Sequence, residues 1–213
     1  MFDGHGGDEA AVLAEQRVEA VLKGTAQVGS VETVLRETFI QLDSEIEETD
    51  FLYGCTAAIV LVDGRNVYSA NAGDARTILI NNKDGAVTRL SHDHSVNDVK
   101  EVERIEAVGG QVRYGRIVSD KGAINVARAL GDKNFGESVS PEPYISKTEL
   151  TEGDYTILTG CDGLFAVMDD EEVATMMKGQ EINKNSTTSL IDHALSLGTN
   201  DNVTVSALRV KVE

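Results

Sequence analysis

Four aspartates are the residues of this sequence whose type and surroundings best suit chemistry. Asp162 follows the apolar, β-branched run 155–160 and precedes a glycine, so we expect it at the end of a buried strand, in a turn. Asp3, Asp74 and Asp201 lie in comparable places, beside glycines or at the ends of strand-like runs. If the fold brings these positions together, the carboxylates would repel one another unless cations neutralised them. The pattern therefore predicts a site for hard divalent metal ions.

The amino-acid composition and net charge argue against some classes of protein. The chain has 213 residues with 36 acidic and 19 basic side chains, and its formal net charge is −17 at pH 7. This balance argues against a surface that binds nucleic acid or an anionic membrane, because both need a basic patch. The length suffices for one sizeable core, so a single domain over residues 1–213 is expected.

The two cysteines, Cys55 and Cys161, fit neither a disulfide framework nor a metal motif, and we expect both to be buried and reduced. No apolar run approaches the length that spans a membrane. The first residues also lack the basic region and hydrophobic stretch of an export signal. We therefore expect a cytoplasmic protein, with the nucleus as the alternative.

Hydrophobic periodicity predicts an alternation of helices and hairpins. The expected helices cover residues 8–23, 30–46, 96–108, 169–178 and 187–197, with Ser30 as an N-cap and Gly24 as a stop. The expected strands cover residues 55–62, 66–70, 75–81, 155–162 and 203–210, and residues 125–131 fit either a strand or a helix. Short glycine-containing connections indicate antiparallel hairpins, and a regular βαβ alternation is missing. The fold class is therefore predicted to be α+β.

Three histidines need separate interpretation. His5 lies in a glycine-rich run that lacks the lysine and the spacing of a phosphate-binding loop. A histidine in such a run, taken alone, is more often a turn residue than a catalyst. His92 and His94 flank an aspartate, but alternate residues offer at most two zinc ligands on one face. We interpret this pair as structural.

Several motifs, in order along the whole chain, resemble the protein phosphatase 2C family of metal-dependent serine/threonine protein phosphatases. The matching segments are Asp3-Gly4-His5-Gly6-Gly7, 54–57, 71–76, 93–94, 103–105, 109–110, 127–132, 161–165 and 201–204. One Asp-Gly-His motif would be a weak signal, but this many segments in the family's order are a strong one. The resemblance implies the family's fold, a four-layer α/β/β/α sandwich of two antiparallel sheets flanked by helices.

The resemblance also implies metal ligands. Asp3 would bridge two Mg²⁺ or Mn²⁺ ions, Gly4 would offer its carbonyl to one, and Asp162 and Asp201 would ligate the other. Asp74 together with Asp162 resembles the family's additional, weaker metal site, so two or three ions are implied. Carboxylate and carbonyl oxygens suit these ions, and a pair about 3.5–4 Å apart can activate a bridging water.

The same resemblance implies a proton donor and a class of substrate. His5 would protonate the leaving serine or threonine alkoxide, because an imidazole titrates near neutral pH. The substrates would be phosphorylated proteins. Residues 100–132 would include a flap beside the active site that shapes substrate choice. In this segment, Arg113, Arg116 and Arg128 either help to hold the phosphorylated substrate or pair with carboxylates, and both interpretations stay open.

Two departures from the family bear on the function. Family members carry strands before Asp-Gly-His with a phosphate-binding arginine and a Glu-Asp pair, whereas here Asp3 follows Met1-Phe2 directly. We therefore interpret the domain as N-terminally shortened, with a frayed first strand and unpaired sheet edges. Ala166 stands where the family often has another aspartate, which puts the additional metal site in question. Three explanations stay open: part of a larger polypeptide, an active short form, or a non-catalytic phosphatase-like binding module.

Overall fold

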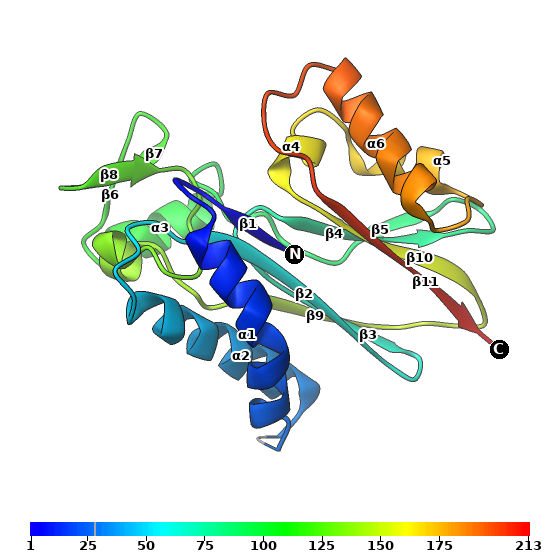
Figure 1. Ribbon diagram of the computed structural model, residues 1–213, viewed down its shortest axis with the longest axis horizontal. Helices are drawn as coiled ribbons and strands as arrows, with labels where there is room; N and C mark the ends of the chain where they lie inside the picture. The colour runs from blue at the N-terminus through cyan, green and yellow to red at the C-terminus, as the bar shows by residue number, and fades with distance from the viewer. Residues whose placement is uncertain (28) are drawn as a thin grey trace.

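The computed structural model describes residues 1–27 and 29–213. Two four-stranded sheets lie at the centre and carry helices on their outer faces (Figure 1). The first sheet has the order β1 (Phe2–Gly4), β2 (Cys55–Asp63), β3 (Asn66–Ala72) and β9 (Tyr144–Glu149). The second has the order β11 (Val205–Val212), β10 (Gly153–Gly160), β4 (Arg76–Asn81) and β5 (Val87–Arg89). All pairs in both sheets are antiparallel, which confirms the predicted α/β/β/α arrangement.

The helices form two groups. The first sheet is covered by α1 (Glu9–Thr25) and α2 (Val31–Glu47), and the second by α4 (Asp162–Phe165), α5 (Asp170–Met177) and α6 (Lys184–Ser196). A further helix, α3 (Val99–Ala107), belongs to the third sheet described below. Among the described residues, no helix is both long and apolar enough to cross a membrane.

Apolar side chains fill the three interfaces between these layers. Phe39 of α2 belongs to the cluster that joins the helices to the first sheet, and Leu190 of α6 belongs to the cluster on the outer face of the second sheet. Along β4, Ile78 and Ile80 join the cluster under the helices, whereas Leu79 joins the cluster between the sheets. This alternation follows from the two-residue period of a strand and shows that the second sheet is covered on both faces.

Several element ends differ from the prediction. The first helix passes Gly24 and ends at Thr25, whose hydroxyl bonds the Val21 carbonyl oxygen (3.0 Å). The α6 helix begins a turn earlier than expected because Asn183 and Ser186 form a capping box. Ser30 caps α2 as predicted, since its hydroxyl accepts a hydrogen bond from the backbone N–H of Thr33 (3.3 Å).

The sequence prediction missed several short elements, among them β5, and left one segment open. Strand β9, which follows Pro143, was not predicted at all. Residues 125–131 form neither a continuous strand nor a helix. Instead, Val126 and Leu130 make isolated bridges with Ser95 and Cys55. These partners lie far away in sequence, so the local pattern could not reveal them.

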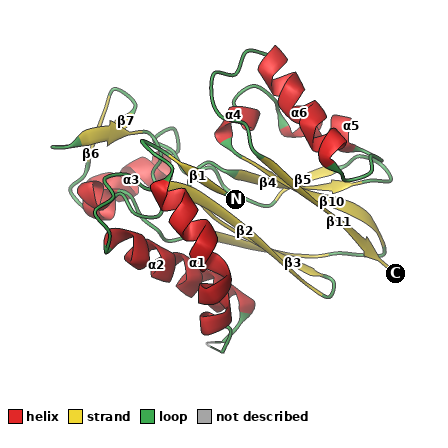
Figure 2. Cartoon of the chain, in the orientation of Figure 1, coloured by secondary structure: helices red, strands yellow, loops and turns green. Residues whose placement is uncertain are grey.

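A third sheet stands beside the two large ones (Figure 2). It consists of β6 (Gln111–Arg113), β7 (Arg116–Ser119) and β8 (Gly122–Ile124), and it packs with α3 and the 3-10 helix η1 (Lys133–Ser138). Ile105, Ile117 and Phe135 form the centre of its small core. This unit coincides with the segment predicted as a flap.

The outer strands of the two large sheets border an apolar groove. The groove has a volume of about 340 Å³, and Phe2 of β1, Ile59 of β2 and Leu208 of β11 are among its lining residues. The first strand is paired rather than frayed, since the Met1 amino group donates to the Ala58 carbonyl oxygen (2.9 Å) and Phe2–Gly4 pair with β2.

Candidate active site

The predicted site residues converge on one pocket between the two large sheets and the third sheet. Its volume is about 170 Å³, and Thr56 and residues 124–126 complete its wall. The pocket is lined by all six residues that the sequence singled out: Asp3, Gly4, His5, Asp74, Asp162 and Asp201. The structure therefore brings together residues from both ends and the middle of the chain.

Strand register explains why three of the aspartates meet. Gly160, the last residue of β10, pairs with the first residue of β4 on one side and with the first residue of β11 on the other. Asp162 follows Gly160 closely, while Asp74 and Asp201 shortly precede β4 and β11. Because both pairs are antiparallel, the end of β10 lies beside the start of its two neighbours. Asp3 arrives from the other sheet, on β1.

The glycine after Asp162 has a tertiary role. Asp162 begins helix α4, so the predicted Asp-Gly turn is wrong. A Cβ atom on Gly163 would lie 2.1 Å from the carbonyl oxygen of Asn202 and 3.3 Å from Cβ of Asp201. Only a glycine allows this approach of the loop before β11. Gly163 thereby brings the Asp201 loop against the start of α4.

The carboxylates of the pocket have no neutralising partner there. Asp3 and Asp162 can each place one oxygen within 4.8 Å of the other and of the Cys161 sulfur. Asp201 is exposed, and its Oδ1 accepts a hydrogen bond from the backbone N–H of Asn202 (2.8 Å). Among the described residues that line the pocket, none is a lysine or an arginine. The site is thus a set of oxygen donors with excess negative charge.

The pKa values of these acids are raised, because the carboxylates are partly buried and lie close to one another. Burial raises the pKa of Asp3 to about 6, and the charges of Asp162 and Asp201 act in the same direction. Burial also raises the pKa of Asp74 to about 7, with a further contribution from Asp162. The pKa of Asp162 itself is raised by burial and by Asp201. Bound divalent cations would relieve this repulsion, and carboxylate oxygens are the donors that Mg²⁺ and Mn²⁺ prefer.

Cys161 lies beside these carboxylates, but its thiol forms hydrogen bonds with the loop before β11. Its thiol donates to the carbonyl oxygen of Asn202 (3.1 Å) and accepts from the backbone N–H of Thr204 (3.2 Å). Burial raises the pKa of the thiol, so it stays protonated and is a poor ligand for a hard ion. Cys161 and Cys55 are both buried and free, as predicted.

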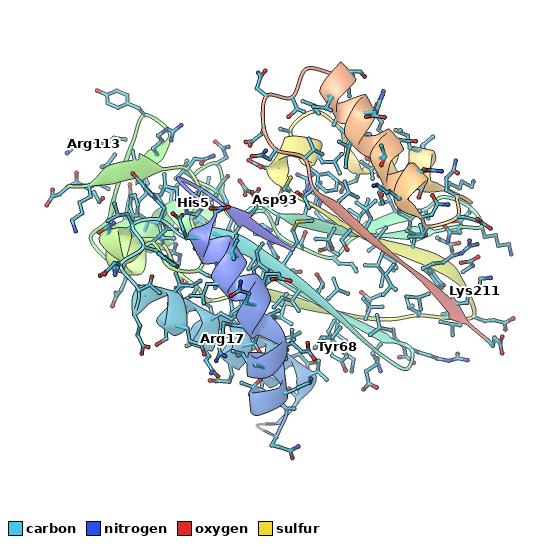
Figure 3. The ribbon with its side chains drawn as sticks, in the orientation of Figure 1. His5, Arg17, Tyr68, Asp93, Arg113 and Lys211 are labelled. Carbon is cyan, nitrogen blue, oxygen red and sulfur yellow. The ribbon has the colours of Figure 1, made fainter. Side chains whose placement is uncertain are left out.

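The structure gives His5 a partner that sequence reasoning missed. Nε2 of His5 lies 2.6 Å from Oδ2 of Asp132, and the other oxygen of Asp132 accepts from the backbone N–H of Gly54 (3.1 Å). The Asp132 side chain is fully buried, and its backbone is left-handed with φ +59°. His5, labelled in Figure 3, follows β1 directly, whereas Asp132 comes from the start of η1. The segment 127–132 had been noted as a motif, but nothing in it indicated the histidine as its contact.

The flap arginines separate into two kinds. Arg128 donates to Glu101 (3.0 Å) and to the Glu142 carbonyl oxygen (2.8 Å), so the pairing interpretation is correct for Arg128. Arg113 and Arg116 are exposed and make no ion pair within the described part of the chain.

The two other histidines have structural contacts. Nε2 of His92 lies 2.6 Å from Oδ2 of Asp98. His94 is buried, and its backbone N–H donates to the carbonyl oxygen of Gly73 (3.0 Å). Burial lowers the pKa of His94 to about 4, so its ring is neutral at physiological pH. His94 thereby fixes the turn that carries Asp74.

Comparison with known proteins gives consistent relatives. The family model described as Protein phosphatase 2C matches residues 1–203. Probable protein phosphatase 2C 5 of Paramecium tetraurelia is 34% identical over 239 residues, which span 96% of this chain and 79% of the relative. Protein phosphatase 2C homolog 1 of Saccharomyces cerevisiae is 31% identical over 227 residues, which span 96% of this chain and 79% of the relative.

Solved structures agree with the fold. A C. elegans sex determining protein superposes with a TM-score of 0.86 at 25% identity, over 97% of this chain and 54% of that protein's chain. The serine-threonine phosphatase 2C from Toxoplasma gondii superposes with a TM-score of 0.83 at 18% identity, over 100% of this chain and 83% of that chain. At 18% identity, the similarity to the Toxoplasma gondii phosphatase shows a shared fold and no more.

Proposed function

Because this chain belongs to the protein phosphatase 2C family and is thus a serine/threonine protein phosphatase, we propose that it hydrolyses phosphoserine and phosphothreonine in proteins with bound Mg²⁺ or Mn²⁺. The observation that carries the metal dependence is the convergence of Asp3, Asp74, Asp162 and Asp201 on one pocket. Within the described lining of that pocket, no basic side chain balances these carboxylates. A phosphate could therefore enter only together with cations.

Asp3, Asp162 and Asp201, with the Gly4 carbonyl, would hold a pair of ions. Such a pair supplies an activated water and neutralises the charge of the phosphate. The raised pKa of Asp3, caused by burial and by the neighbouring carboxylates, supports this role, because a nearby cation would offset both effects. The loop of Asp201 is exposed and packs against α4, so Asp201 would complete the ligand set from the solvent side.

A third ion would be held less firmly. Asp74 and Asp162 both line the pocket and provide two carboxylates for it. Ala166 follows the last residue of α4 and offers only a methyl group. The additional site thus has fewer charged ligands than the pair and would bind its ion more weakly.

His5 would protonate the leaving alkoxide. Its Nε2 is engaged by Asp132, which leaves Nδ1 as the nitrogen available to the substrate. After Nδ1 gives its proton, the neutral ring keeps the other proton on Nε2, where the Asp132 carboxylate accepts it. Asp132 thereby selects the tautomer and orientation of His5 that suit an acid.

A phosphatase-like binding module is the second candidate. The observation in its favour is the lack of a lysine or arginine among the described residues that line the pocket, since a phosphate would then contact no protein cation. Such a module would bind metal and phosphoprotein without turning the substrate over.

Hydrolysis of a phosphothreonine peptide, with and without millimolar Mn²⁺, separates these two functions. Phosphate release that requires Mn²⁺ and is lost in Asp162→Ala is expected for the phosphatase. Thermal melting of the same samples would verify that the variant is folded. Mn²⁺ binding by a folded chain that releases no phosphate would favour the module, and release that is indifferent to EDTA would overturn the metal mechanism.

A further inference from the structure

The hairpin between β6 and β7 has an unusual tip. Its two turn residues, Tyr114 and Gly115, have φ values of +52° and +72°, as in a type I′ turn. Such turns favour asparagine and glycine, and a bulky side chain in this conformation costs about 1–2 kcal/mol. The Tyr114 side chain is fully exposed, so no packing within the described residues offsets that strain. The fold therefore presents an aromatic ring to solvent at the tip of the hairpin.

Two arginines flank this ring. Arg113 and Arg116 are paired across the hairpin and are both exposed. Seven other arginines of the described chain form ion pairs, namely Arg17, Arg36, Arg76, Arg89, Arg104, Arg128 and Arg209. Arg116 and Arg65 each donate only to a backbone carbonyl oxygen, that of Ala123 (3.4 Å) and that of Glu213. In a chain with a net charge of −17, guanidinium groups without an ion pair are exceptional, and two of the three among the described residues stand at the tip 113–116.

Register places the Arg116 end of this tip close to one wall of the active-site pocket. Ile117 pairs with Ile124, and Ile124 to Val126 line the pocket. Arg116 precedes Ile117, so with strand spacings of about 3.4 Å along and 4.8 Å across, its backbone lies about 6 Å from that of Ile124. Figure 3 shows Arg113 on this sheet, which projects beyond the body of the molecule. The other turn of the sheet, at 120–121, lies at the far end.

We propose that the tip 113–116 binds the residues next to the phosphorylated side chain and selects substrates with acidic residues there. This inference rests on the proposed function, because it assumes that a phosphopeptide occupies the pocket. The guanidinium groups of Arg113 and Arg116 match carboxylates in charge and geometry, and the exposed Tyr114 ring supplies an apolar surface for the peptide. The rest of the chain would repel an acidic peptide, so its recognition depends on these two cations.

Matched phosphothreonine peptides test this selection. Three peptides differ only in the flanking residues, which are aspartate, alanine or lysine, and kcat/KM is measured for each with Mn²⁺. Two exposed ion pairs predict a preference of about fivefold to tenfold for the aspartate peptide over the alanine peptide. The preference should disappear in Arg113→Ala/Arg116→Ala through a higher KM, with kcat unchanged. Arg65→Ala, which removes an exposed arginine at the β2–β3 turn, is the matched control and should keep the preference.

A further variant tests the ring without breaking the turn. Asn-Gly is a favoured sequence for a type I′ hairpin, so Tyr114→Asn should keep the hairpin folded. It should raise KM for all three peptides and leave their ranking unchanged. A ranking that favours the lysine peptide, as expected from the net charge alone, would overturn the inference.

Hydrolysis of p-nitrophenyl phosphate distinguishes failure of this inference from failure of the proposed function. This substrate has no flanking residues, so all the tip variants should hydrolyse it like the parent chain. Mn²⁺-dependent hydrolysis without any flank preference would leave the phosphatase standing and refute the tip's role. If neither substrate is turned over, the same peptides labelled with a fluorophore give binding constants by anisotropy, and equal affinities would refute the inference there too.

Discussion

Two acidic clusters lie near one another at the second sheet. The carboxylates of one have no protein cation beside them, whereas those of the other are paired with arginines. In the pocket, Asp74 and Asp162 face other carboxylates, and burial together with these neighbours raises their pKa values. In the second group, which we call the ion-pair cluster, Arg76 and Arg89 hold Asp93 and Asp170. Nε of Arg76 donates to Asp93 (3.1 Å), its Nη1 donates to Asp170 (2.9 Å), and Nε of Arg89 also donates to Asp170 (2.8 Å).

The pKa of Asp170 shows the effect of these partners. Burial opposes its ionisation, but hydrogen bonds from Arg89 and Arg76 outweigh burial and hold the pKa below its usual range. Arg76 follows Asp74 by two residues and stacks its guanidinium over the Phe165 ring at 4.6 Å. The arginines of the ion-pair cluster thus account for the lowered pKa of Asp170. Acids that a fold leaves unneutralised beside an available arginine mark a place for an external cation.

Of the variants that test this difference between the two clusters, Asp162→Asn should lose the most activity. Loss of a carboxylate at the centre of the pocket should lower kcat on a phosphothreonine peptide by at least about a thousandfold, because ion binding and charge neutralisation fail together. The metal-free variant should melt at or above the temperature of the parent, because repulsion is reduced. Calorimetric Mn²⁺ titration and melting in EDTA measure the two effects. A variant that kept its activity would remove Asp162 from the site.

Arg76→Met should show the converse behaviour. It leaves Asp93 and Asp170 with Arg89 as their remaining cation, so the free energy of unfolding should fall by about 3 kcal/mol. Urea denaturation in EDTA measures this loss. Mn²⁺ affinity of the folded variant should change little, and a loss as large as that of Asp162→Asn would show that the two clusters act as one.

Asp132→Asn tests a carboxylate that is paired with a histidine rather than an arginine. The amide oxygen can keep the bond to Gly54, but the NH₂ group would face Nε2 of His5 and favour the wrong tautomer. Hydrolysis of the phosphothreonine peptide should fall by about a hundredfold, whereas p-nitrophenyl phosphate, whose leaving group needs no proton, should lose less than about tenfold.

A double-mutant cycle gives the control for Asp132. If Asp132 acts through the ring, then Asp132→Asn should have almost no further effect in a His5→Asn background. Equal losses on both substrates, or additive losses in the double variant, would mean that Asp132 only supports the fold.

The smallest expected effect is on the pH dependence of stability. The folded-state pKa values of Asp3 and Asp74, about 6 and about 7, lie above their unfolded values, so the metal-free folded state binds extra protons. Stability from this source is present at low pH and is lost as pH rises through about 4 to 7. The lowered pKa of Asp170 has the opposite sign, and its contribution is lost only under acid conditions.

Melting temperatures in EDTA at about pH 5 and pH 8 measure this difference. The melting temperature should fall between them, Asp74→Asn should reduce the fall, and Mn²⁺ should counteract it because ion binding displaces protons. An identical fall in the parent and in Asp74→Asn would assign the pH dependence to the net charge of the surface.

The sequence predicted the carboxylate pocket better than its surroundings, for a physical reason. Turn and strand signals are local, so each pocket aspartate could be placed at a strand end, and the family resemblance supplied their convergence. The contact of His5 with Asp132 joins residues 127 positions apart, and that of Arg76 with Asp170 joins residues 94 apart. Hydrophobic periodicity is a local property of the sequence and does not indicate such long-range contacts. Gly163 was misread as a turn residue because its need for space comes from Asn202, a tertiary neighbour.

The order of the ligands along the chain bears on how the protein is made. Asp3 is synthesised before the other ligands, while the last of them, Asp201, comes just before β11. The β4–β10 pair that helps to assemble the pocket likewise joins an early and a late segment, and contacts of such long sequence separation form slowly. A nascent chain can therefore build the first sheet and its helices before it holds a complete set of ligands. If the proposed metal site is correct, its ligand set would be complete only when β11 has docked, and hydrolysis would begin only then.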